Sequence, residues 1–241
     1  MNVPTVKVAQ MAGYAAVADL AKLAGLGGRI QPTPSIALGS YEATPLDIAG
    51  AYTVFANHGV YVRPSLISQV KTRDGSVIYS HTAETRQVLD PRVAYLMVNL
   101  MEDVMNSGTA AGVRSRGFYA PAAGKTGTSR DGWFAGFTSQ LLCVVWVGID
   151  DNSELKLEGA KSALPIWTEF MKRAIQQPPY RDPKPFKPPP GISGASIDPD
   201  TGLLASPECP TTRNEFFIAG TEPGEMCDRH ARAGIITVSA Q

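Results

Sequence analysis

The sequence has no excess of charge of either sign. Its 22 lysine and arginine residues balance 22 aspartate and glutamate residues over 241 positions. A chain without net charge has no overall field that would draw it to nucleic acid or to an anionic membrane surface. We therefore expect neither partner for the chain as a whole.

Long hydrophobic runs are also lacking. The longest, residues 141–149, is about half as long as a membrane-spanning helix requires. This run is typical of a β-strand. The segment MNVPTVKVAQ at positions 1–10 has no basic stretch followed by an apolar one, so the chain shows no secretion signal.

Cysteine is scarce, with three residues in the chain. Cys143 lies inside the apolar run and is predicted to be a small core residue. Cys209 and Cys227 lie in a tail rich in proline and glycine, where a disulfide would stabilise a segment with little core and would indicate an oxidising compartment. Free thiols, or a zinc site that also uses His230, are the alternatives. Because only three candidate metal ligands are visible, we predict the disulfide and no metal site.

The first half of the sequence predicts helices and a hairpin. Residues 3–25 form two short helices that break near Gly13, and a third helix lies within residues 44–59. Residues 65–80 contain two alternating segments joined by Asp-Gly, which is a strong hairpin signal. The signals that bound the third helix are a Thr44 cap, Pro45 in the first turn, Asp47 as the capping-box partner and a stop at Gly59.

The second half predicts helix, strands and helix, and together these elements indicate an α+β fold with an antiparallel sheet flanked by helices. A helix opens at Asp90-Pro91, two strands meet near residues 139–140, and a last helix follows Pro165. The second of these strands is apolar on both faces, so we predict a central position for it. The apolar stripe of the first helix is predicted to be Val93, Leu96, Met97, Leu100, Met101 and Val104, and that of the last helix Ile166, Trp167, Phe170, Met171, Ala174 and Ile175.

Seven prolines stand between positions 178 and 190, and no helix or central strand accepts that density. We therefore predict three parts: a main domain over residues 1–177, a stiff proline-rich linker over 178–191 and a small C-terminal extension over 192–241.

The segment KTGTSRDGWFAGFT, residues 125–138, places polar residues where a core strand would carry valine. It opens a strand, an apolar hairpin follows at once, and a long helix ending in Asn-Ser-Gly-Thr-Ala precedes it. In this setting it resembles the lysine-containing active-site strand of penicillin-binding protein transpeptidases and their serine β-lactamase relatives. The segments ALGSYEATPLDIAGAYTVFANHGVYVRP, LLCVVWVGIDDN and GAKSALPIWTEFM are similar to the bifunctional, class A, high-molecular-weight members.

The resemblance covers residues 2–175, and the tail is similar to the short C-terminal extension of the same group. It implies a β-lactamase/transpeptidase-like fold that is incomplete at its N-terminal side. It also implies a binding strand for the carboxylate of a wall peptide. Lys125 would supply an ammonium group, and the hydroxyls of Thr126 and Thr128, two residues apart on a strand, would point to one side.

Two further roles follow from the resemblance. Gly127 would keep the strand clear of a side chain that obstructs packing or substrate, and the Thr128 N–H would be one oxyanion donor. For KTGT alone, the structural alternative is a capped strand edge with an exposed lysine. Asn2 matches the asparagine of the family's Ser-x-Asn motif, where it would bind the substrate backbone and position the catalytic lysine.

The nucleophile of the family lies in a Ser-x-x-Lys motif, and the sequence does not supply it at the expected place. Of the serines near the lysine strand, only Ser153-Glu-Leu-Lys has the spacing, and it follows the strand in a polar loop. The resemblance therefore implies that the chain is the C-terminal half of a transpeptidase domain. We expect the isolated chain to be inactive and its sheet to have an uncovered edge that permits self-association.

The implied function is a D,D-transpeptidase that cross-links peptidoglycan stem peptides by serine acyl transfer and binds β-lactams. The alternatives are a serine β-lactamase-like hydrolase and a non-catalytic, truncated binding chain. Serine acyl transfer requires no cofactor. The resemblance also implies an extracytoplasmic location, a missing N-terminal half as partner, and a membrane link only through an N-terminal anchor that this chain lacks.

Overall fold

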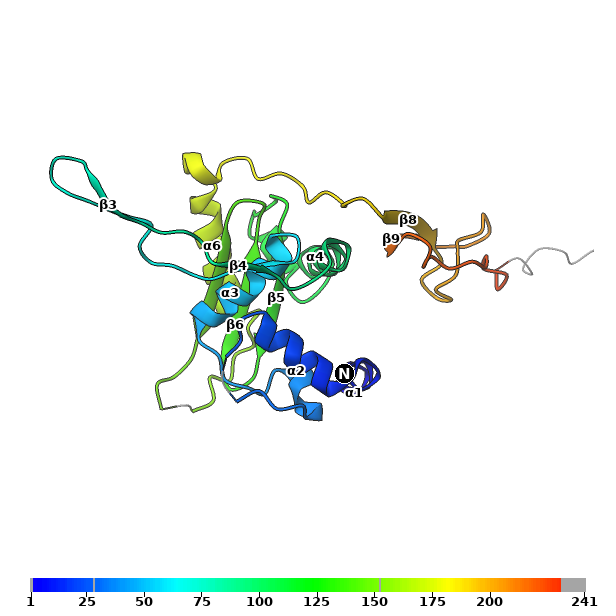
Figure 1. Ribbon diagram of the computed structural model, residues 1–241. Helices are drawn as coiled ribbons and strands as arrows, with labels where there is room; N and C mark the ends of the chain where they lie inside the picture. Colours follow the sequence, from blue (N-terminus) through cyan, green and yellow to red (C-terminus); the bar gives the residue numbers. More distant parts are fainter. Residues whose placement is uncertain (1, 28, 152, 231–241) are drawn as a thin grey trace, which may run out of the picture. The chain divides into compact units, whose positions relative to one another are not determined.

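The computed structural model of the chain describes residues 2–27, 29–151 and 153–230. It divides into two compact units, Met1–Lys187 and Pro188–Gln241. The first unit contains helices around a three-stranded antiparallel sheet (Figure 1). Among the described residues, none of the helices combines the length and the apolar character needed to cross a membrane.

The N-terminal part of the first unit is helical, as predicted. Helices α1 (Asn2–Ala12) and α2 (Tyr14–Leu23) are separated by Gly13. Gly13 has φ of 87°, a left-handed conformation that favours glycine and ends the first helix. A short 3₁₀ helix, η1 (Pro34–Leu38), follows.

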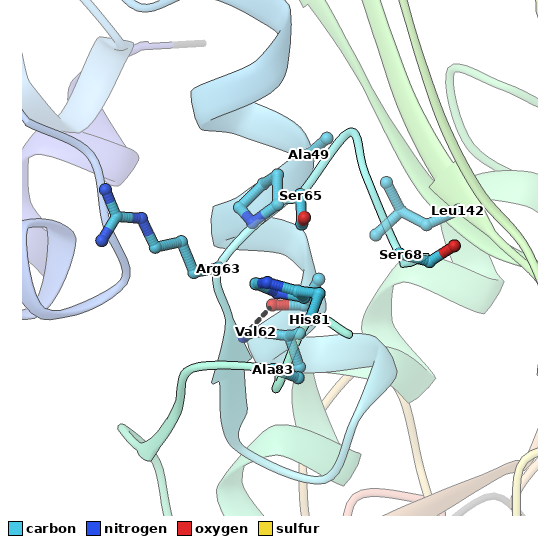
Figure 2. Close-up of a pocket in the computed structure, with 10 residues that line it drawn as sticks. Ala49, Val62, Arg63, Ser65, Ser68, His81, Ala83 and Leu142 are labelled. Atoms are coloured by element: carbon cyan, nitrogen blue, oxygen red, sulfur yellow. Dashed lines mark hydrogen bonds between the residues drawn. The ribbon is translucent and has the colours of Figure 1, made fainter. Parts of the chain in front are cut away.

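Helix α3 (Pro45–Ala56) begins at the predicted capping box. The Asp47 N–H donates to Thr44 Oγ1 at 3.1 Å, and the Thr44 N–H donates to Asp47 Oδ2 at 3.1 Å. The helix is tied to strand β1 (Val60–Val62) by the Val62 N–H, which donates to Thr53 Oγ1 at 2.8 Å (Figure 2). Strand β4 (Thr85–Gln87) pairs with β1.

The hairpin predicted around Asp-Gly is formed by strands β2 (Gln69–Lys71) and β3 (Val77–Ser80). Every residue of both strands is exposed. The Asp74 carboxylate accepts hydrogen bonds from the hydroxyls of Thr72 and Ser76, which fixes the turn. The hairpin is therefore held by its own turn rather than by burial against the rest of the unit.

The main sheet consists of β5 (Ala123–Thr128), β6 (Gly132–Phe137) and β7 (Leu142–Val147), all antiparallel, with β6 in the middle. The prediction that β7 is central is wrong for the described residues, where β7 is an edge strand. Helices α3 and α6 both pack against β7. Apolar residues on both faces of this strand therefore reflect helices on its two faces, not strands on its two sides.

Helix α4 (Pro91–Asn106) begins where predicted, with Asp90 as its cap, but its buried face is not the predicted one. Met97 and Leu100 are 37% and 52% exposed, so their assignment to the core stripe is wrong. The apolar residues of the helix span more than half of its circumference, and tertiary packing selects the part that turns inward. The buried residues are Ala94, Tyr95, Val98, Met101 and Met105.

Helix α6 (Ala163–Ala174) begins two residues before Pro165, earlier than predicted. Its predicted stripe is correct for Trp167, Met171 and Ala174, which are buried. The stripe is wrong for Ile166 and Phe170, which are 52% and 50% exposed. The short helix α5 (Gly112–Ser115) lies between α4 and the sheet in the sequence and contacts α6.

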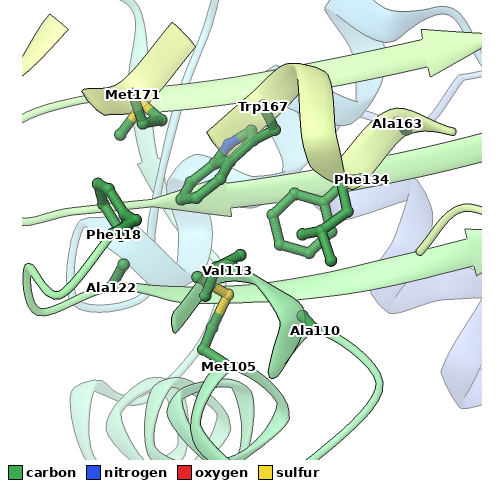
Figure 3. Close-up of a cluster of buried hydrophobic side chains, with 10 residues drawn as sticks. Met105, Ala110, Val113, Phe118, Ala122, Phe134, Ala163, Trp167 and Met171 are labelled. Carbon is green, nitrogen blue, oxygen red and sulfur yellow. The ribbon is translucent and has the colours of Figure 1, made fainter. Parts of the chain in front are cut away.

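Trp167 is the centre of the larger core cluster (Figure 3). Its ring meets Phe134 of β6 and Phe118 edge to face, with centroids 4.9 and 5.3 Å away. Its indole N–H donates to the carbonyl oxygens of Gly136 and Cys143 at 3.3 and 3.1 Å. A second cluster on the other face of the sheet consists of Val98, Met101, Ala123 and Phe137.

The first part of the predicted linker, residues 178–191, packs on the first unit. The 3₁₀ helix η2 (Pro178–Tyr180) follows α6, and Pro183 is buried. The Phe186 ring meets Phe137 with centroids 5.5 Å apart. The Lys184 N–H donates to Ser139 Oγ at 2.9 Å. This stretch is therefore held against the β6–β7 turn.

The second unit is built on one antiparallel pair, β8 (Ile192–Ile197) and β9 (Arg213–Ile218). Cys209 and Cys227 are both free thiols, so the predicted disulfide is not present in the structure. The sequence analysis did not single out Asp198, whose carboxylate accepts a hydrogen bond from Cys227 Sγ at 3.2 Å. The Asp198 carboxylate thus lies beside the Cys227 sulfur, which the sequence predicted to be bonded to Cys209.

Candidate functional site

Strand β5 carries the four residues that the sequence predicts to bind substrate. They are paired with β6, with Lys125 opposite Ala135, Thr126 opposite Phe134 and Thr128 opposite Gly132. The strand is buried where it begins and more exposed from Lys125 onward. It is an edge strand of the described sheet, and helix α4 packs against it. The buried residues at the start of β5 thus hold its polar end in place.

The Thr126 hydroxyl has a partner that sequence reasoning missed. Thr109, in the Ser-Gly-Thr-Ala segment after α4, places its Oγ1 2.7 Å from Thr126 Oγ1. A pair of hydroxyls at this distance shares one hydrogen, so one of the two oxygens retains a hydrogen that a second acceptor can take. A carboxylate is such an acceptor.

The Thr128 hydroxyl is fixed by a residue that comes later in the sequence. Its Oγ1 accepts a hydrogen bond from the Gly159 N–H at 3.0 Å. Because the N–H occupies an acceptor site, the hydroxyl hydrogen of Thr128 stays available to an incoming anion. Gly127 lies close to the neighbouring strand, since a Cβ built on it would stand 3.1 Å from Trp133 Cβ.

Lys125 lies on the exposed part of the strand, and its ammonium folds back onto it. Nζ donates to the Thr126 carbonyl oxygen at 2.7 Å and to Thr126 Oγ1 at 3.3 Å. Although the residue as a whole is exposed, the surroundings of the ammonium desolvate it, and this lowers the pKa of Lys125 below its ordinary value. Lys125 and Thr126 together form a donor group suited to an anion.

The loop that leads into β5 is held by Arg114. Its guanidinium donates to the carbonyl oxygens of Phe118 and Ala120 at 2.9 and 3.1 Å. It also donates to Asn106 Oδ1 at the end of α4 at 2.7 Å. Nearby Glu102 is desolvated and lies near Asp103, and both effects raise the pKa of Glu102 to about 7.

Asn2, the remaining residue predicted for the site, is at the start of α1. Helix α1 packs against η1 and α2. The structure therefore brings together the four β5 residues with Thr109 and Gly159, and it records no hydrogen bond between Asn2 and that group among the residues it describes.

Ser-x-x-Lys spacing occurs at two places, one of which the sequence analysis overlooked. Ser153 is in an exposed loop, where its N–H donates to Asp151 Oδ1 at 2.9 Å. Ser68 stands before β2, and Lys71 ends that strand. In an extended chain, residues three apart point to opposite faces. Neither pair lies on a helix, so neither presents serine and lysine on one helical face.

A shallow pocket of about 390 Å³ lies elsewhere on the first unit (Figure 2). Its lining includes His81, Arg63 and Leu142. Leu142 pairs with Phe137, which in turn pairs with Ala123 at the start of β5. The pocket is thus at the opposite end of the sheet from Thr128, and it is not part of the β5 group.

Comparison with known proteins decides what this arrangement is. Residues 1–172 match the family model described as the penicillin binding protein transpeptidase domain. The chain belongs to this transpeptidase family. Residues 188–232 match a second model, described as the C-terminal domain of penicillin-binding protein 1A.

Relatives of this transpeptidase-family chain include penicillin-binding protein 2D of Bacillus subtilis, which is 34% identical over 235 residues, covering 94% of this chain and 33% of the relative. Penicillin-binding protein 1A of Aquifex aeolicus is 33% identical over 241 residues, covering 98% of this chain and 32% of the relative. The chain thus spans about a third of the length of these relatives.

Solved structures of penicillin-binding proteins share the fold of this transpeptidase-family chain. Penicillin-binding protein 1A of Haemophilus influenzae has a TM-score of 0.83 at 27% identity, covering 94% of this chain and 40% of that one. The PonA1 protein of Mycobacterium tuberculosis in complex with penicillin V has a TM-score of 0.56 at 26% identity, covering 71% and 53%. The predicted α+β class is confirmed by these matches.

Proposed function

We propose that this chain is the carboxylate-binding part of a serine D,D-transpeptidase that cross-links peptidoglycan stem peptides. The observation that carries the proposal is the β5 group. An ammonium and two fixed hydroxyls follow one another on an exposed strand end, in a chain of the transpeptidase family. The related PonA1 structure is a complex with penicillin V, which supports a β-lactam as an alternative ligand of such a group.

In this proposal each β5 residue has one task. Lys125 attracts the terminal carboxylate of the stem peptide, and the hydroxyls of Thr126 and Thr128 donate hydrogen bonds to it. The Thr128 N–H is one of the two donors to the oxyanion that forms when a serine attacks the penultimate carbonyl. Asn2 binds the peptide backbone from the Ser-x-Asn position. No cofactor takes part in this chemistry.

The serine nucleophile is proposed to come from a segment outside these residues, because neither Ser-x-x-Lys spacing within them is helical. The products are an acyl-enzyme and free D-alanine, and the amine of a second stem peptide then releases the acyl group. Stem peptides are wall components, so the proposed place of action is outside the cytoplasm.

Labelling with fluorescent penicillin tests whether the serine nucleophile lies outside this chain. The isolated chain is expected to carry no covalent label after incubation and denaturation, because its β5 group can bind but cannot attack. A covalent label on Ser68, Ser153 or any other serine of this chain would overturn the assignment of the nucleophile to another segment.

A chimera tests the role of β5 itself. The corresponding segment of B. subtilis penicillin-binding protein 2D is replaced by this chain, and the acylation rate with fluorescent penicillin is measured. Thr126→Val is expected to slow acylation by roughly 10- to 100-fold, because a hydrogen bond to a charged group contributes about 1.5–3 kcal/mol. Thr85→Val, on the exposed strand β4, is the control and should leave the rate unchanged.

The same chimera distinguishes a transpeptidase from a hydrolase by the lifetime of its penicillin adduct. A long-lived penicillin adduct is expected for the proposed function. Rapid release of hydrolysed penicillin would instead assign the site to a β-lactamase-like hydrolase.

A further inference from the structure

The second unit holds two groups of metal-binding side chains that the β5 group does not use and that share Asp198: one with Cys209 and Cys227, the other with Asp200 and His230. Asp198 follows directly after β8. Backbone hydrogen bonds bring the later residues to it: the Asp198 N–H donates to the Leu203 carbonyl oxygen at 2.9 Å, and the Cys227 N–H donates to the Leu204 carbonyl oxygen at 2.8 Å. The cluster is thus a product of the fold of this unit.

The ligand atoms of this cluster converge on the Asp198 carboxylate. Those of Asp198, Cys209 and Cys227 all lie within 4.8 Å of one another. Cys227 Sγ is 3.2 Å from Asp198 Oδ2, and His230 Nε2 is 3.5 Å from the same oxygen. Asp198 is 0% exposed and Cys227 is 3% exposed. The group is therefore shielded from water on the carboxylate side.

An unpaired buried nitrogen is the second observation. His230 Nε2 is buried and has no hydrogen-bond partner, although it faces the carboxylate. A buried polar atom without a partner costs free energy, and in native structures it commonly marks a bound water or ion. Around Cys209, the Ser206 N–H donates to the sulfur at 3.3 Å.

We propose that Asp198, Cys209 and Cys227 bind one divalent transition metal ion of the zinc class, with His230, whose Nε2 lies 3.5 Å from Asp198 Oδ2, as the fourth ligand. Two thiolates, one imidazole and one carboxylate form a donor set that zinc accepts in tetrahedral geometry. Bond lengths of about 2.0–2.3 Å to one centre imply ligand-to-ligand distances of about 3.4–3.8 Å. The 3.2 and 3.5 Å separations are close to that range. Binding releases the two thiol protons to solvent.

Thr201 has a positioning role in this site. Its hydroxyl donates to Asp198 Oδ2 at 2.7 Å, and this is the oxygen that faces both Cys227 and His230. Partners of this kind orient a ligating carboxylate. A second acidic residue, Asp200, belongs to a cluster with Asp198 and His230, but that cluster contains no sulfur. The thiolates favour zinc over calcium or magnesium.

The test uses the full chain, purified with a phosphine reductant and then dialysed against Zn²⁺ or Co²⁺. We expect one tightly held zinc ion per chain, and in the Co²⁺ form a thiolate-to-metal charge-transfer band together with the intense visible bands of tetrahedral Co²⁺. Cys209→Ser and Cys227→Ser should each lose the charge-transfer intensity of one thiolate and at least about tenfold in zinc affinity. Thr201→Val should lower affinity by about 10- to 100-fold.

Cys143→Ala is the matched control, because Cys143 lies in β7 of the first unit. It should keep the zinc stoichiometry and the Co²⁺ spectrum. If a cysteine variant fails to fold, His230→Gln supplies the same information through an altered visible Co²⁺ spectrum. The proposal is overturned if the reduced wild-type chain retains no zinc and gives no thiolate band. It is equally overturned if protein purified without reductant contains a Cys209–Cys227 disulfide that zinc does not prevent.

Discussion

At the scale of single residues, Gly159 positions the β5 group through its backbone. Its N–H is the donor that fixes the Thr128 hydroxyl. A Cβ built on Gly159 would stand 2.3 Å from the Gly127 carbonyl oxygen and 2.5 Å from that of Trp133. Both are backbone atoms of the β5–β6 hairpin and cannot rotate away. The loop before α6 can therefore approach the strand only because this position has no side chain.

Gly159→Ala is expected to destabilise the first unit by about 2 kcal/mol or more, because the loop and the hairpin must separate. Urea unfolding followed by tryptophan fluorescence measures the effect. Gly27→Ala is the control, since a Cβ there meets nothing within 4 Å and should change the free energy of unfolding by less than about 0.5 kcal/mol. Equal stability of the two variants would contradict the close approach.

Glu102 should make the free energy of unfolding depend on pH. Its folded-state pKa is raised from 4.5 to about 7, so the folded state binds a proton more tightly than the unfolded state. The resulting stabilisation is fully present below about pH 4.5 and is lost as the pH rises through about 7. Allowing for partial solvent screening, we expect a loss of about 1 kcal/mol between pH 5 and pH 8.

Glu102→Gln should remove this part of the pH dependence, and denaturant titrations at pH 5, 6, 7 and 8 measure it. Glu154→Gln, in an exposed loop, should keep the wild-type slope. If the free energy of unfolding of Glu102→Gln changed with pH as in the wild type, the Glu102 carboxyl group would be solvated in the folded state.

At the scale of helices and strands, the indole of Trp167 joins α6 to two strands. Trp167→Phe leaves the carbonyl oxygens of Gly136 and Cys143 without their shared donor and removes part of a ring that is 0% exposed. We expect a loss of about 2–3 kcal/mol in urea unfolding. Tyr119→Phe, at a 77% exposed position, should cost less than about 1 kcal/mol. A reversed order would contradict the central place of α6.

Elements with local signals could be predicted from the sequence. The Thr44–Asp47 capping box, the Asp-Gly hairpin and the Gly13 break each depend on neighbouring residues, and all three are found. The buried faces of α4 and α6 could not be predicted in full. Both helices carry apolar residues on more than one face, so the contacts with the sheet decide which face is buried.

The candidate site, too, could be predicted from the sequence only in part. The sequence motif identifies the β5 residues. Their partners are distant in the chain: Thr109 is 17 residues from Thr126, and Gly159 is 31 residues from Thr128. Only the folded structure brings these partners together. The carboxylate of Asp198, close to both cysteines, was missed for the same reason, since it is 29 residues from Cys227.

At the scale of the whole molecule, the outer edge of β7 determines behaviour in solution. Among the described residues no strand pairs with that edge, and the strand sequence LCVVWV is apolar. An edge of this kind is a template for another strand. We expect the isolated chain to associate as its concentration rises, and light scattering with thermal unfolding over a hundredfold concentration range measures it. A monomer with a concentration-independent melting temperature would contradict this expectation.

The proline-rich segment that joins the two units has a consequence for limited digestion. Lys184 and Lys187 are each followed by proline, a bond that trypsin does not hydrolyse, and Lys184 is also anchored to Ser139. The exposed hairpin of β2 and β3 offers Lys71 and Arg73 instead. Brief trypsin treatment should therefore nick the hairpin and leave Lys184–Pro185 and Lys187–Pro188 intact, and the masses of the fragments would show it.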